Sequence, residues 1–224
     1  MTAGAVRETA AVLRERILAI AAHELGVAIE DIELADSRAS VRAKPAVGVS
    51  FKDLAALAVA PTGLEASARY TANSPSIWVN ATHVCTCEVD VATGRVQLLR
   101  YIVSEDCGPM INPNVVEGQI AGGTVQGIGG VLFEHLAYDD DGNPVATTFM
   151  DYLLPTAAEV PAIEFGHIET PIPGPGGYKG VGEGGAIGAP PAVVNAVADA
   201  LSPFGVKITR LPLGPSQIVA LLDR

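Results

Sequence analysis

The sequence predicts an α+β fold in two parts, a small helical and hairpin segment over residues 1–60 and a larger domain over residues 61–224. Three observations predict this class: apolar residues at helical spacing near the N-terminus, two β-branched runs around a short turn, and apolar runs that follow helix-capping residues. Pro61–Gly63 is the expected boundary between the two parts. A chain of 224 residues is long enough for one large domain or two small ones.

The N-terminal part begins with a predicted helix over residues 5–25, where apolar side chains recur at three- and four-residue spacing. The weak alternation that follows predicts a short hairpin around Asp36–Ser37. Ser50 and Asp53 have the spacing of a capping box, so we expect a second helix over about 51–59.

The larger part opens with a strand pair within residues 76–104, because two β-branched runs flank the turn "ATG". Asn112 can cap a helix and Pro113 suits its first position, which predicts a helix over about 114–136. Each glycine inside this helix costs up to about 1 kcal/mol relative to alanine. Two explanations remain open for them, close approach of a ligand or backbone and tight helix packing. They are Gly118, Gly122, Gly123, Gly127, Gly129 and Gly130.

Proline and glycine residues mark the expected boundaries of the C-terminal elements. Pro190 and Pro191 are suited to the first turn of a helix, which we expect over about 190–201, after a loop over 170–188. The other predicted elements are strands over 145–154, 163–169 and 206–210, a solvated acidic turn at "YDDDGNPV", and a helix after Ser216.

Composition limits the classes of partner. The formal net charge is −11 and the 14 Lys and Arg residues form no basic run, which argues against a nucleic-acid partner. Charged residues make up 17% of the chain, against roughly 25% in ordinary domains, so we expect another chain to cover part of the surface. The sequence shows no apolar leader run and no 18-residue apolar stretch, so we expect no membrane span and a cytoplasmic location.

The cysteines are interpreted as reduced structural residues. Cys85 and Cys87 would lie on one face of a strand, and Cys107 is the third. No second pair completes a four-cysteine zinc or iron–sulfur site, and the dispersed histidines match no zinc motif. No residue of the chain is therefore predicted to ligate a metal.

One carboxylate stands in a glycine-rich loop, Glu183 in "GYKGVGEGG". Glycines allow a ligand to approach the backbone, and a glutamate there can act as a general base; the alternative is a surface loop with an incidental glutamate. The letters of residues 180–185 fit the dinucleotide pattern G-x-G-x-x-G, but a Pro-rich loop precedes them where that motif needs a strand.

Two amides form the second candidate. Gln119 and Gln126 are seven positions apart and share a predicted helical face with Gly122, Gly123 and Gly130. Amides donate and accept hydrogen bonds, which suits the edge of a pterin or a base, whereas the alternative is a pair of surface amides.

Two long segments resemble a known family. "EDCGPMINPNVVEGQIAGGTVQGIGG" and "KGVGEGGAIGAPPAVVNAVADAL", with "FMDYLLPTA" and "ETPIP" between them, resemble the C-terminal part of the large subunit of the molybdenum hydroxylases. That family includes xanthine dehydrogenase, aldehyde oxidase and aerobic carbon monoxide dehydrogenase. The resemblance covers nearly all of the chain and implies mixed strands with long packed helices around a molybdenum–pterin cofactor, in the cytosine dinucleotide form.

The resemblance also assigns residues. It implies that Glu183 is the base that deprotonates a metal-bound hydroxyl, and that Gln119 contacts the pterin. Gly180, Val181 and Gly182 would lie along the cofactor.

The resemblance implies partners as well, because the chain is much shorter than the family's large subunit. We expect a partner chain with the N-terminal half of that subunit, a [2Fe–2S] subunit, an FAD subunit, and a dimer of the whole heteromer. A heterocycle, an aldehyde or carbon monoxide would be the substrate. The alternative is a non-catalytic assembly or binding module that retains the fold, which the absence of molybdenum and pterin from the native complex would favour.

Overall fold

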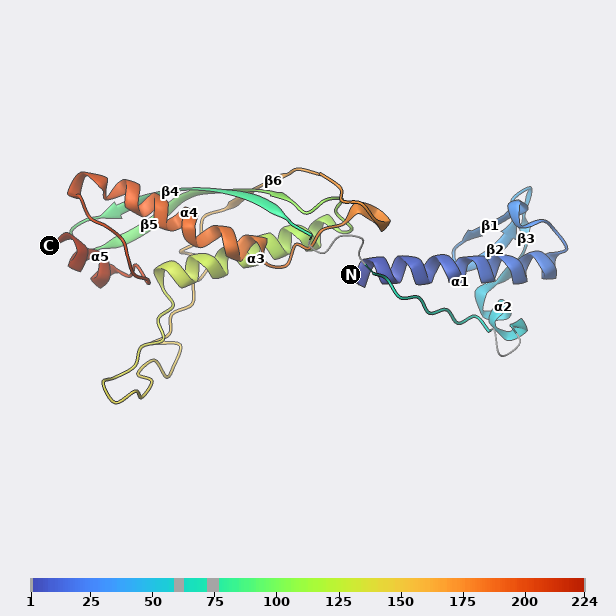
Figure 1. The fold of residues 1–224 in the computed structure, drawn as a ribbon, viewed down its shortest axis with the longest axis horizontal. Helices are drawn as coiled ribbons and strands as arrows, with labels where there is room; N and C mark the ends of the chain where they lie inside the picture. Colours follow the sequence, from blue (N-terminus) through green and yellow to red (C-terminus); the bar gives the residue numbers. More distant parts are fainter. Residues whose placement is uncertain (1, 59–62, 72–76, 224) are drawn as a thin grey trace. The chain divides into compact units, whose positions relative to one another are not determined.

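The computed structural model describes residues 2–58, 63–71 and 77–223. Contacts divide the chain into two compact units, residues 1–75 with 173–176, and residues 76–172 with 177–224. The boundary expected at Pro61–Gly63 lies largely outside the described residues. Each unit has its own three-stranded sheet and its own hydrophobic core (Figure 1).

The first unit packs one long helix on a small antiparallel sheet. The predicted hairpin is confirmed: Asp36 and Ser37 both have positive φ, 47° and 58°, which suits a two-residue turn between twisted strands. The predicted cap is confirmed too, because the Ser50 hydroxyl accepts a 3.1 Å hydrogen bond from the Asp53 amide. The elements are α1 (Thr2–Leu25), β1 (Ile32–Ala35), β2 (Arg38–Val41), β3 (Lys44–Ser50) and α2 (Phe51–Leu57).

The second unit is built on a mixed sheet in the order β4-β5-β6. The predicted strand pair is confirmed as β4 (Asn80–Asp90) and β5 (Arg95–Asp106), which are antiparallel, and β6 (Ile163–His167) runs parallel to β5. Cys85 and Cys87 both pack against the core from β4, as expected of residues on one face.

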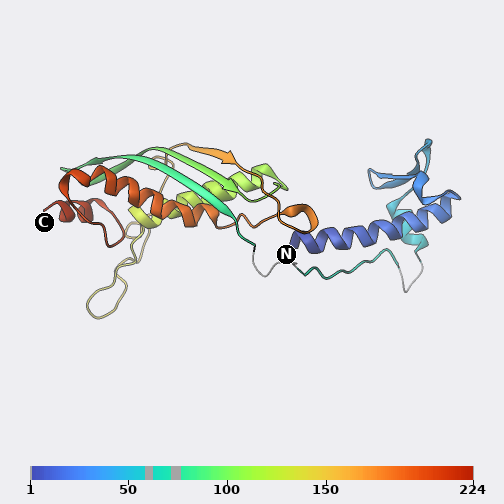
Figure 2. The same cartoon turned by 45° about the horizontal axis from the view of Figure 1, so that its top comes forward.

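Two helices cover one side of this sheet. Figures 1 and 2 show α3 (Pro113–Leu132) and α4 (Gly184–Ala200) side by side on that face. The Asn112 side chain accepts a hydrogen bond from the Val115 amide, which confirms the predicted cap of α3. The shorter α5 (Pro215–Leu222) closes the described part of the chain, and single-turn 3₁₀ helices lie at Ile29–Asp31, Pro175–Gly177 and Ser202–Phe204.

The strands expected over 145–154 and 206–210 do not form. The first stretch lies in the long loop between α3 and β6, which extends away from the sheet in Figure 1. Local turns use its backbone groups instead, as when the Tyr152 amide donates to the Thr148 carbonyl. β-propensity describes a fit to neighbouring strands, and neither segment has such a neighbour among the described residues.

Helix α4 starts earlier than expected. It begins at Gly184, so that Pro190 and Pro191 lie inside it and the predicted loop over 170–188 ends at Glu183. Glycine is a weak helix former, and packing outweighs that weakness here. No helix within the described ranges is long and apolar enough to cross a bilayer.

Candidate functional site

Glu183 occupies the N-cap of α4. Its carbonyl oxygen accepts the first hydrogen bond of the helix, 3.0 Å from the Ile187 amide nitrogen. Its side chain is exposed and makes no capping hydrogen bond within the described residues. The side chain therefore stands at the N-terminal end of α4, where the helix dipole favours negative charge.

The glycines around Glu183 are of two kinds. A methyl group placed on Gly180 or Gly182 would meet no other atom of the described chain within 4 Å. One placed on Gly185 would lie 2.8 Å from the Thr124 amide nitrogen, and one on Gly184 would lie 2.8 Å from the Glu105 carboxyl carbon. The first two glycines face open space, whereas the protein's own packing requires the other two.

The glycines of α3 divide in the same way. Gly118, Gly122 and Gly130 have open space beside their α-carbons, and Gln119 and Gln126 are exposed with them on one face. Gly123, which we expected on that face, is buried instead, because a methyl group there would lie 2.8 Å from the Ala186 amide nitrogen. Tight packing against α4 therefore explains Gly123, whereas the exposed glycines have open space beside them.

The structure brings the two candidate segments together. The first turn of α4, at Gly185, lies against the α3 backbone at Ile120 and Thr124. Glu183 is two residues before that contact and Gln119 is one residue before Ile120. Val181 differs from its neighbours, because its half-buried side chain packs on the core.

A buried ion pair holds the segment before Glu183. Lys179 Nζ lies 2.9 Å from Asp106 Oδ2, at the end of β5, and the side chains are 4% and 8% exposed. Asp106 also accepts hydrogen bonds from the Thr170 hydroxyl, from the Thr170 amide at 3.1 Å and from the Gly108 amide at 3.0 Å. The bonds from Thr170, and then that from Lys179, hold the pKa of Asp106 well below its usual range.

Sequence reasoning missed this ion pair. Asp106 and Lys179 lie in the two segments that carry the family resemblance, but they are far apart in the chain and share no periodicity. The Lys179 amide also donates to the Cys107 carbonyl at 2.9 Å, so backbone and side chain are both tied to the end of β5. Residues 180–183 therefore lie between two fixed points, Lys179 at the end of β5 and Gly185 against α3.

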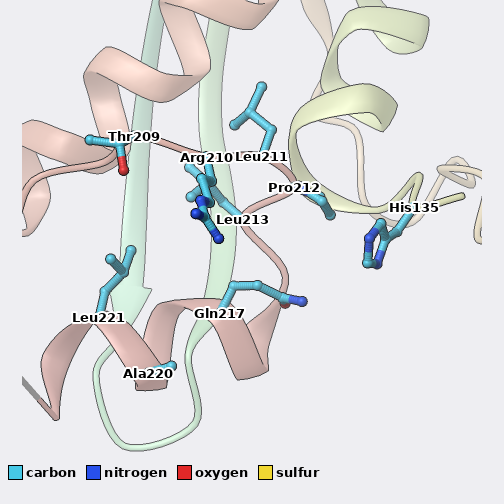
Figure 3. Close-up of a pocket in the computed structure, with 9 residues that line it drawn as sticks. All are labelled: His135, Thr209, Arg210, Leu211, Pro212, Leu213, Gln217, Ala220 and Leu221. Carbon is cyan, nitrogen blue, oxygen red and sulfur yellow. The ribbon is translucent and has the colours of Figure 1, made fainter. Parts of the chain in front are cut away.

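No cluster of three or more metal-binding side chains occurs in the described ranges. A pocket of about 390 Å³ lies elsewhere, between residues 209–213, α5 and His135 (Figure 3). Figure 3 shows the Arg210 guanidinium extending from this segment toward α5. None of the predicted site residues lines this pocket.

Comparison with known proteins places the chain in a family. The family model of the molybdopterin cofactor-binding domain matches residues 1–161. The nicotine 6-hydroxylase large subunit of Paenarthrobacter nicotinovorans is 44% identical over 226 residues, which cover 96% of this chain and 28% of that protein. The carbon monoxide dehydrogenase large chain of Afipia carboxidovorans is 37% identical over 207 residues, which cover 89% and 26%.

Solved structures agree with these matches. Quinoline 2-oxidoreductase from Pseudomonas putida 86 has a TM-score of 0.80 and 41% identity over 96% of this chain and 28% of its own. Carbon monoxide dehydrogenase from Oligotropha carboxidovorans has a TM-score of 0.78 and 32% identity over 98% and 28%. The chain thus spans about 28% of the length of the nicotine 6-hydroxylase subunit and of these two solved chains. It belongs to the molybdopterin cofactor-binding domain family and corresponds to part of a molybdenum hydroxylase large subunit.

Proposed function

We propose that this chain forms the C-terminal part of the molybdenum–pterin site of a molybdenum hydroxylase, with Glu183 as its catalytic base. One observation carries the proposal: an exposed carboxylate at the start of α4, next to Gly182 and its open space, stands at the junction of α4 with α3. The cofactor-binding domain expected from the sequence, residues 61–224, includes all of these residues, whereas the family match ends at residue 161.

Open space beside glycines supports the fit of a bulky cofactor. Gly180 and Gly182 leave room along the loop, and Gly118 and Gly122 leave room along the exposed face of α3. In this proposal Gln119 hydrogen-bonds the pterin edge, and the backbone of Gly180, Val181 and Gly182 lies along the cofactor, in its cytosine dinucleotide form. When bound, the cofactor supplies the oxygen that is transferred and takes up two electrons.

The chemistry that Glu183 would perform is proton transfer. With a heterocycle or an aldehyde, oxidative hydroxylation converts a C–H bond and water into a C–OH group, two protons and two electrons. With carbon monoxide, the same oxidation converts CO and water into carbon dioxide, two protons and two electrons. Glu183 accepts one of the protons at its exposed carboxylate, which lies at the N-terminal end of α4. In this proposal, [2Fe–2S] and FAD groups on partner chains would accept the two electrons.

Partner chains complete the enzyme in this proposal. The relatives that the chain matches include a "large subunit" and a "complex subunit gamma", and it spans 28% of each. Exposed apolar side chains support a covering partner, since Phe149 and Met150 are 77% and 86% exposed. The partners are the rest of the molybdenum subunit, an iron–sulfur subunit and an FAD subunit, as a dimer of the heteromer in the cytoplasm. The substrate is a small heterocycle, an aldehyde or carbon monoxide.

The experiment isolates the native complex and measures its molybdenum, its pterin and its turnover. Glu183→Gln is expected to abolish turnover while molybdenum and pterin stay bound, because the amide cannot accept the proton. Glu88→Gln, an exposed glutamate on β4, is the matched control and should change nothing. Near-normal turnover in Glu183→Gln would refute the assignment, and a native complex with neither molybdenum nor pterin would favour the non-catalytic assembly module.

A further inference from the structure

Glu105 is a buried carboxyl group whose oxygens have no hydrogen-bonding partner among the described residues. The residue is 1% exposed at the end of β5, and neither Oε1 nor Oε2 bonds to another described residue. Burying such a group unpaired is costly, so buried polar atoms normally have partners. Because an unpaired buried carboxyl group lowers stability, the presence of glutamate at this position needs another explanation.

The neighbour of this carboxyl group is the first residue of α4. A methyl group on Gly184 would lie 2.8 Å from Cδ and 2.9 Å from Oε2 of Glu105, so only glycine leaves room for the carboxyl group. Gly184 follows Glu183 directly. The first amides of a helix have no acceptor inside it, and the helix dipole attracts a carboxyl oxygen placed at that end.

Glu105 and Asp106 hold the two ends of one short segment. They are neighbours in β5, so their side chains leave the strand on opposite faces. Asp106 pairs with Lys179, and Glu105 packs on Gly184. The four residues between those contacts, Gly180–Glu183, carry the proposed base.

We propose that Glu105 is a positioning residue for Glu183, because its buried carboxyl group sets the place of the first turn of α4. The inference rests on the proposed function, in which Glu183 is the base. Burial raises the pKa of Glu105, and His167 on β6 opposes that shift. A neutral amide of the same shape is therefore a fair substitute, and Glu105→Gln is the conservative variant.

The first test compares Glu105→Ala with Glu105→Gln in the assembled, molybdenum-containing complex. Glu105→Ala is expected to lower kcat about 10- to 100-fold, the cost of displacing a catalytic group by about 1 Å. KM and molybdenum content should change little, and amide hydrogen exchange at residues 184–187 should become faster. Glu105→Gln should retain most of kcat and the native exchange rates.

The second test uses compensation. Gly184→Ala places a methyl group against the Glu105 carboxyl group, and Glu105→Asp shortens that side chain by one methylene. Each single variant should lose kcat, and the double variant should recover much of it, because the added methyl group fills the vacated space.

Three results would overturn the inference: an unchanged kcat in Glu105→Ala, losses that simply add in the double variant, or loss of molybdenum from Glu105→Gln as well as Glu105→Ala. These outcomes are separate from the proposed function, which depends on Glu183→Gln. If Glu183→Gln is inactive while Glu105→Ala is fully active, Glu183 remains the base and Glu105 has no part in placing it.

Discussion

Lys179 and Asp106 form a buried ion pair, with 2.9 Å between Nζ and Oδ2, which ties the loop before Glu183 to the end of β5. The same unit holds a contrasting exposed pair, Arg100 with Glu164, whose Nε and Oε1 lie 2.5 Å apart while their side chains are 59% and 51% exposed. Water screens the exposed pair, whereas removing Lys179 leaves the buried Asp106 carboxylate without its cation. The two pairs therefore provide a matched comparison.

Lys179→Met is expected to lower the melting temperature of the complex by more than about 5 °C, because Asp106 keeps its burial and loses its cation. Arg100→Gln should lower it by less than about 2 °C. Differential scanning fluorimetry at fixed salt measures both. Equal shifts in melting temperature would mean that burial of the Lys179–Asp106 pair adds nothing to stability.

Asp106 also predicts how stability depends on pH. Its pKa is lowered in the folded state, first by Thr170 and then by Lys179, so at acid pH the unfolded chain binds more protons than the folded chain. The stabilisation is complete above the ordinary aspartate pKa of about 4, and it is lost as the pH falls through the lowered folded value. Melting temperatures measured from about pH 6 downward should begin to decrease once the pH is below about 4. In Asp106→Asn this decrease should be less steep.

Two adjacent glycines of α3 should respond differently to alanine. Gly123→Ala is expected to destabilise the protein by about 1–3 kcal/mol, because its methyl group would lie 2.8 Å from the Ala186 amide nitrogen. Gly122→Ala should leave stability unchanged or raise it by up to about 1 kcal/mol, since a methyl group there would meet no atom of another described segment within 4 Å. Urea denaturation compares the two.

If the open face of α3 holds the cofactor, Gly122→Ala should also lower the molybdenum content of the complex. Normal molybdenum in the stable Gly122→Ala variant would place the cofactor away from this face.

Gln119→Ala tests the proposed pterin contact. The residue is exposed on α3, so its removal should leave the melting temperature of the cofactor-free protein unchanged while pterin occupancy falls. Gln97→Ala, an exposed amide on β5, is the control and should leave occupancy unchanged. Equal pterin occupancy in the two variants would argue against the assigned contact.

Several elements could be predicted from sequence because local chemistry specifies them. The cap at Asn112, the hairpin at Asp36–Ser37 and the β4–β5 pair depend on residues close together in the chain, whose conformational preferences act without the rest of the fold. The start of α4 was predicted wrongly. The two prolines suggested that the helix begins at Pro190, whereas it begins at Gly184, where it packs against Glu105 and α3. The strand expected over 145–154 does not form, because a strand also needs a neighbouring strand and β-propensity says nothing about one.

The sequence by itself determined the family, the local caps and turns, and the choice of Glu183 and Gln119 as candidates, because these depend on residue identity and short-range spacing. Only the tertiary structure decided which glycines face open space, that Gly184 and Gly185 are required by packing, and that carboxylates of β5 contact both ends of Gly180–Glu183. Those features depend on which distant backbones come within van der Waals contact. The periodicity of residues within one segment of the chain cannot predict such long-range contacts.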